Sequence, residues 1–162
     1  MKAHSLDQVV WTVSTVALAK EHVERPRLSD RIDVLRAVAK EVSWLAVDIT
    51  EQQLLVDISD GYDVLIMGAD KWHQIQDPKF YDHDPIARDA AMEALPQLAI
   101  APRPPLVIPR HLELEVPDWT HVVSSTDVRG GRHDWMLDQA HQFAVRSGAW
   151  IDPERYEDWL AE

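Results

Sequence analysis

Short apolar runs alternate with amphipathic stretches along this chain, a pattern typical of an α/β fold. The apolar runs predict strands at Val9–Ser14, Trp44–Ile49, Asp63–Gly68, Gln97–Ala101 and His121–Val123. Helical spacing and helix-start signals predict helices at Ser29–Lys40, Pro85–Leu95, Asp134–Arg146 and Pro153–Leu160. The alternating segment His111–Val116 predicts a further short, half-exposed strand. With 162 residues and no internal repeat, the chain is expected to form a single domain spanning residues 1–162.

Two of the predicted strands end in small polar turns. One apolar run leads into Gly68-Ala69-Asp70, and another leads into Ser124-Ser125-Thr126-Asp127-Val128-Arg129. Open α/β sheets bind their ligands at the carboxyl ends of strands, so both turns are expected at a ligand-binding rim. A helix that begins near Ser125 or Thr126 would present free N–H groups, with Arg129 one turn later on the same side as Thr126. This arrangement suits phosphate, although a capped helix with a surface arginine is the simpler alternative.

Five segments occur in an order that resembles a known family. These are Leu6–Ser14, Lys20 with Leu28–Leu35, Gly68–Asp70, Ser124–Arg129 and Ile151–Leu160. Their order is similar to that of the nucleotidylyltransferase superfamily, and within it to the bacterial nicotinate-mononucleotide adenylyltransferases. The resemblance implies a Rossmann-like, doubly wound parallel sheet. It also implies adenylyl transfer from ATP to a mononucleotide such as nicotinate mononucleotide, with pyrophosphate as the leaving group.

The resemblance also implies roles for individual residues. The phosphates of ATP would be held by Ser125, Thr126 and Arg129, while Lys20 would neutralise charge near the reacting phosphorus. Lys20 and Arg129 are therefore the expected catalytic residues.

The nucleoside would be held by the other turn. Gly68 would let the backbone approach it closely, Asp70 would accept hydrogen bonds from it, and Trp72 would stack on a base or pyridine ring. Mg²⁺ is expected with ATP, held by phosphate oxygens and water rather than by a protein metal site.

The chain lacks one part of the family pattern, a first central strand followed by a His-x-Gly-His turn. Its eight histidines include no pair two or three residues apart. Without this strand, about five buried apolar side chains are lost. Their loss lowers the free energy of unfolding by on the order of 10 kcal/mol, which is comparable to the whole stability of a domain. Three explanations stay open: a natural start upstream of Met1, a sheet rearranged or completed by another subunit, or loss of the element together with catalysis. We therefore expect weak or no activity from these residues and a homo-oligomer, with a catalytically degenerate nucleotide-binding or assembly protein as the alternative function.

Charge and composition narrow the functional class. The net charge of −12 argues against nucleic-acid binding, because an acidic surface repels a phosphate backbone. There is no cysteine, no run long enough to cross a membrane and no signal peptide, so a cytoplasmic protein is expected. An ATP site then needs a local basic pocket, for which the candidates are Lys20, Arg25, Arg27, Arg31, Arg103, Arg129 and Arg132.

Seven tryptophans and two histidine-containing loops invite further functional interpretations. Packing is the better explanation for most tryptophans, namely Trp11, Trp44, Trp135, Trp150 and Trp159. The loops around His83 and His133 lack the spacing of a metal site and are expected to be solvated.

Overall fold

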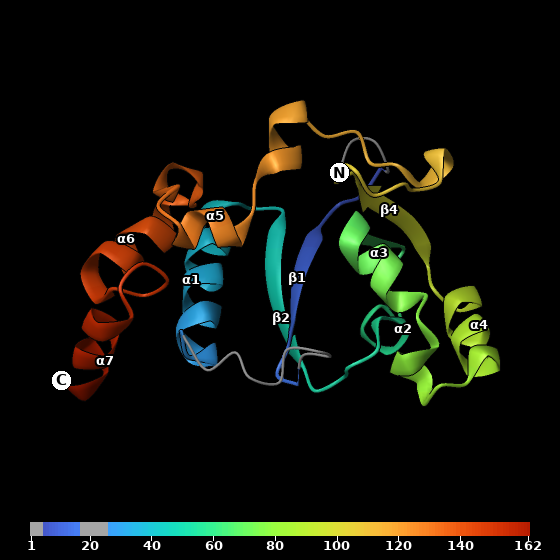
Figure 1. Cartoon of the computed structure of the whole chain (residues 1–162), viewed down its shortest axis with the longest axis horizontal. Coiled ribbons are helices and arrows are strands. Elements are labelled where there is room, and N and C mark those ends of the chain that lie inside the picture. Colours follow the sequence, from blue (N-terminus) through green and yellow to red (C-terminus); the bar gives the residue numbers. More distant parts are fainter. Residues whose placement is uncertain (1–4, 17–25) are drawn as a thin grey trace. The chain divides into compact units, whose positions relative to one another are not determined.

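The computed structural model describes residues 5–16 and 26–162 and has an α/β architecture (Figure 1). Four strands in the described residues form two parallel pairs, and the chain divides into two compact units. The first unit comprises Met1–Glu51 and Val123–Glu162, and the second comprises Gln52–Val122. Within the described ranges, no helix is both long enough and apolar enough to span a membrane.

The first unit contains strands β1 (Val9–Ser14) and β2 (Leu45–Thr50), joined through helix α1 (Leu28–Glu41). The strands run parallel, with Val9 opposite Leu45 and Ser14 opposite Thr50. Helix α1 buries Ile32, Val34 and Val38. Its apolar face packs against β2 and against helix α6 (Asp138–Ser147), as the crossover of a βαβ unit requires.

An aromatic cluster forms the other side of this unit, where α6 meets helix α7 (Pro153–Ala161). Phe143 contacts Trp150 and Trp159 edge-on, with ring centroids 5.9 and 5.5 Å apart. Tyr156 is only 2% exposed and stacks on Trp159. Packing therefore accounts for these two tryptophans, as predicted from the sequence.

The second unit contains helix α2 (Leu55–Ile58), strand β3 (Val64–Gly68), helices α3 (Ala69–Ile75) and α4 (Pro85–Glu93), and strand β4 (Gln97–Ala101). Strands β3 and β4 are parallel, with Val64 opposite Gln97 and Gly68 opposite Ala101. A 3₁₀ helix at Pro78–Tyr81 precedes α4. The core of this unit consists of the buried residues Met67, Ala69, Ile75 and Ile100.

The prediction of a strand at His121–Val123 is wrong. Residues Asp118–Val122 form a 3₁₀ helix, in which both the amide and the hydroxyl of Thr120 donate to the Pro117 carbonyl, at 2.9 and 2.7 Å. This turn competes with a strand, and the Val122 side chain is 65% exposed, so no buried face rewards an extended conformation.

Several smaller expectations also need correction. His111–Val116 contributes a 3₁₀ helix at Arg110–Leu112 and one isolated bridge, between Glu113 and Ile100, instead of a full strand. The helix predicted from Asp134 begins at Asp138, because Leu137 before it has an extended backbone. Trp44, expected in the core, lies just before β2 and is 45% exposed. Helices α2 and α3 occur where no helix is predicted.

Candidate functional site

The Gly68-Ala69-Asp70 turn lies at the junction of β3 and α3, as predicted. Gly68 has an ordinary extended backbone (φ −82°), so its conformational freedom is not what the turn requires. A Cβ atom on Gly68 would instead lie 2.7 Å from the Asp70 carboxylate oxygen Oδ1. The Asp70 side chain therefore folds back over Gly68, and a side chain at position 68 would displace the exposed Asp70 carboxylate. Ala69 is fully buried beneath, and the exposed Asp70 is left as a hydrogen-bond acceptor.

Trp72, expected to stack on a ring of the ligand, lies one turn into α3. It is half-buried and packs against the core that includes Met67 and Ile100. Its carbonyl accepts a hydrogen bond from the Gln76 side-chain amide at 2.9 Å. Part of the indole surface is therefore committed to packing, and only the remainder is available to a ligand.

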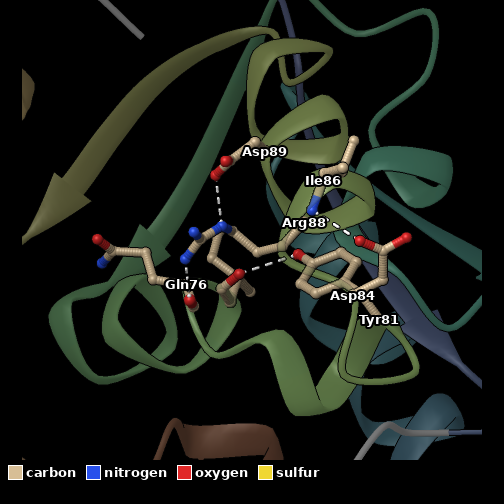
Figure 2. Close-up of polar contacts among 7 residues, drawn as sticks. Gln76, Tyr81, Asp84, Ile86, Arg88 and Asp89 are labelled. Atoms are coloured by element: carbon tan, nitrogen blue, oxygen red, sulfur yellow. Dashed lines mark hydrogen bonds and ion pairs between the residues drawn. The ribbon is translucent and has the colours of Figure 1, made fainter.

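A cluster that the sequence did not reveal holds the other end of α3 (Figure 2). The Arg88 guanidinium donates to the Gln76 carbonyl at 2.6 Å, and the Tyr81 hydroxyl donates to the Ile75 carbonyl at 2.9 Å. Arg88 also pairs with Asp89 at 2.6 Å. These side chains satisfy carbonyls that a helix C-terminus leaves unpaired. The cluster thereby fixes the helix that carries Asp70 and Trp72.

The second turn forms a short helix, α5 (Ser125–Arg129), which begins where the sequence predicts. Ser124 is its N-cap, and the hydroxyl accepts the Asp127 amide at 3.0 Å while donating to the Asp127 carboxylate at 2.5 Å. Arg129 donates from Nη2 to the Thr126 hydroxyl at 3.3 Å. The expectation that these two side chains meet on one side of the helix is confirmed.

The charge around α5 is mixed. Ser125, Thr126 and Arg129 are exposed, and the Asp127 carboxylate lies in the same first turn. An anion at this turn would therefore meet one cation and one carboxylate, so its affinity depends on reaching Arg129 and the free N–H groups while avoiding Asp127.

Arg132, a further candidate for the basic pocket, is already paired. It forms two 3.0 Å hydrogen bonds with the Asp134 carboxylate, and its guanidinium lies 3.8 Å from the centroid of the Trp135 ring. These hydrogen bonds raise the pKa of Arg132 and lower the pKa of Asp134. Arg132 is thus neutralised locally, which leaves Arg129 as the more available cation near Gly130-Gly131.

Other candidates for the basic pocket differ in their exposure and in their hydrogen bonds. Lys20 and Arg25 lie outside the described residues. Arg27 is the exposed N-cap residue of α1, and its backbone N–H donates to the Tyr156 hydroxyl at 2.9 Å. Arg31 is half-buried, and its Nε has no hydrogen-bond partner among the residues that the structure describes.

The predicted site residues divide between the two units. Gly68, Asp70 and Trp72 belong to the second unit, and Ser125, Thr126 and Arg129 to the first. One turn offers an acceptor carboxylate that lies over Gly68, and the other offers hydroxyls and a cation. In the described part of the chain, no group of three His, Asp or Glu side chains is arranged to hold a metal ion. No protein-family model, curated protein or solved structure matches this chain.

Proposed function

We propose that this chain is a nucleotidylyltransferase-like protein that binds ATP and a mononucleotide such as nicotinate mononucleotide. The observation that carries the proposal is the geometry of α5, where a Ser124-capped turn holds the Arg129 guanidinium against the Thr126 hydroxyl. A helix start with an arginine one turn later suits the terminal phosphates of ATP. The resemblance drawn from the sequence assigns these residues the same role.

The pairing within each unit is compatible with the doubly wound parallel sheet that the resemblance implies. In the usual order of a doubly wound sheet, the third strand lies beside the second, followed by the first, the fourth and the fifth. Strands β1 and β2 of this chain correspond to the second and third, and β3 and β4 to the fourth and fifth. Removing the first strand from that order leaves two parallel pairs, β2 with β1 and β3 with β4, and these are the pairs observed.

The chemistry of the proposed site is positioning and charge neutralisation. The α5 turn and Arg129 would hold the β- and γ-phosphates, Lys20 would neutralise charge near the α-phosphorus, and Asp70 would accept hydrogen bonds from the nucleoside. Mg²⁺ would be held by phosphate oxygens and water. No histidine pair of the His-x-Gly-His kind occurs in this sequence, and losing one comparable donor costs roughly 10²–10³ in rate.

That missing charge stabilisation favours a second candidate function. A protein that keeps the phosphate-binding turn without the histidines would bind nucleotide with little or no turnover, as a nucleotide-binding or assembly protein. Pyrophosphate release from ATP in the presence of nicotinate mononucleotide separates the two functions. The enzyme releases it with multiple turnovers, whereas the binding protein releases none.

Titration calorimetry with ATP and with pyrophosphate tests the site itself. Arg129→Ala should weaken both ligands about tenfold or more, because it removes a charged hydrogen-bond donor. Asp70→Ala should weaken ATP only, since pyrophosphate has no nucleoside. Arg36→Ala, an exposed arginine on α1, is the matched control and should change neither. If neither Arg129→Ala nor Asp70→Ala weakens ATP by even about 1 kcal/mol, the site assignment is wrong.

A further inference from the structure

The turn that joins α2 to β3 contains the only Asp-Gly pair of the sequence, Asp60-Gly61. The Tyr62 amide donates to the Ser59 carbonyl at 3.1 Å, and this hydrogen bond closes the turn around the pair. Gly61 has a φ of +80°, which residues with a side chain rarely adopt, and both Asp60 and Gly61 are exposed. The pair therefore lies in a glycine-dependent surface turn of the second unit.

This turn brings a carboxyl group and a backbone nitrogen together within one chain. A bond between Asp60 Cγ and the Gly61 nitrogen closes a five-membered ring, and an intramolecular closure avoids the entropy cost of bringing two molecules together. Gly61 has no Cβ atom to shield its nitrogen. The amide that closes the turn belongs to Tyr62, so that hydrogen bond does not occupy the Gly61 nitrogen.

We propose that Asp60-Gly61 is a site of spontaneous aspartate isomerisation. The Gly61 nitrogen attacks Asp60 Cγ, the new C–N bond forms, the bond from Cγ to its hydroxyl oxygen breaks, and the amide proton leaves with that hydroxyl as water. The product is a cyclic imide. Water then adds back and opens the ring. Cleavage at Cγ restores aspartate, whereas cleavage at the main-chain carbonyl gives isoaspartate, in which the backbone runs through Cβ and Cγ.

The folded turn slows this reaction only modestly. Ring closure requires the peptide between Asp60 and Gly61 to rotate until its nitrogen faces the carboxyl group, which breaks the hydrogen bond between Tyr62 and Ser59. The loss of one such bond lowers the population of the reactive conformation about tenfold or less. Glycine accommodates the rotation because its φ is equally free on both sides of zero.

Isomerisation changes the backbone between α2 and β3. Isoaspartate adds one methylene group to the main chain at position 60, so the turn no longer has the length that the hydrogen bond from Tyr62 to Ser59 requires. The modified residue also keeps a free carboxylate, so the charge of the chain does not change. The modification depends on neither nucleotide binding nor the arrangement of the two units.

Peptide mapping of the full native chain, incubated at physiological temperature and pH, tests the proposal. Electron-transfer fragmentation distinguishes isoaspartate from aspartate, and a protein isoaspartyl methyltransferase is an independent probe. We expect isoaspartate to accumulate at position 60, at a rate within about tenfold of that in the chain unfolded in guanidinium. Asp63, which is exposed but precedes the β-branched Val64, is the internal control and should remain unmodified.

Asp60→Glu is the matched control variant. It keeps the negative charge and Gly61 but places the carboxyl carbon one bond further away, so it should form no β-linked residue at position 60. The proposal is overturned if the native wild type forms no isoaspartate at position 60, whether or not the unfolded chain does. Equal conversion at Asp63 would also overturn it, because Gly61 would then not be the cause.

Discussion

Replacing Tyr156 by phenylalanine tests how the first unit is held together. The Tyr156 hydroxyl, carried on α7, accepts the Arg27 amide at the start of α1 at 2.9 Å and donates to the Asp30 carboxylate. The ring is 2% exposed and stacks on Trp159, so Tyr156→Phe keeps the packing and removes only the hydroxyl.

The structure sets the expected magnitude. A hydrogen bond to a backbone amide contributes about 0.5–1.5 kcal/mol, and one to a carboxylate contributes about 1.5–3 kcal/mol. The full sum is about 2–4.5 kcal/mol, but Arg27 is exposed and Asp30 half-buried, so water can replace part of what is lost. We expect Tyr156→Phe to lower the free energy of unfolding by about 2 kcal/mol.

Urea unfolding followed by tryptophan fluorescence measures this loss, because Trp150 and Trp159 report on the same aromatic cluster. Tyr62→Phe, at an exposed tyrosine of the second unit, is the control and should change stability by less than about 0.5 kcal/mol. A double-mutant cycle with Asp30→Asn isolates the hydroxyl–carboxylate pair. If Tyr156→Phe is as stable as the wild type within about 0.5 kcal/mol, the hydroxyl does not join the two helices as described.

The same variant carries a pH signature. Burial, reinforced by the hydrogen bond to Asp30, raises the pKa of Tyr156 above its ordinary value of about 10. Below a pH of about 10 the hydroxyl is protonated in both folded and unfolded chains, so its full contribution to stability is present. As the pH rises above about 10 the unfolded chain ionises first, and stability falls until the raised pKa of the folded state is passed. In Tyr156→Phe, stability should fall less at alkaline pH. Part of the fall should remain, because burial also raises the pKa of Tyr81.

Two further predictions concern single residues. Gly148→Ala should cost at least about 2 kcal/mol in urea unfolding, because φ is +83° and the new Cβ would lie 2.8 Å from the Asp152 carbonyl oxygen. Gly61→Ala, with a similar φ of +80° and open space around it, should cost about half as much, and equal losses would refute the steric argument. Arg88→Ala should cost about 1–3 kcal/mol and speed amide exchange at the end of α3, because the Gln76 carbonyl loses its charged donor. Arg88→Lys should have a stability between those of the wild type and Arg88→Ala. Unchanged amide exchange at the end of α3 in Arg88→Ala would show that the contact does not hold this helix.

Much of the secondary structure was predictable from the sequence. Strands β1 and β4 have the predicted bounds, and α1 extends the predicted helix by one residue at each end. The contact between Thr126 and Arg129 also follows from the sequence, since residues three apart on a helix are neighbours. Alternation, helix caps and short spacings are local properties, which a linear pattern records.

What the sequence did not predict depends on partners distant along the chain or on how well a segment is buried. His121–Val123 has the composition of a strand, but with Val122 exposed the turn at Pro117 prevails. Trp44 and Trp150 have similar apolar character, yet only Trp150 finds an aromatic core to pack against. The Arg88 cluster was missed because its partners are backbone carbonyls, which no residue type identifies.

By itself, therefore, the sequence determined an α/β chain, most of its strands and helices, and the two polar turns that carry the candidate site residues. The tertiary structure alone decided that the strands form two parallel pairs, that Asp70 folds over Gly68, and that part of Trp72 is committed to the core. The physical reason is range: propensity and periodicity act over a few residues, whereas strand pairing, burial and close approach depend on which distant segments exclude water together.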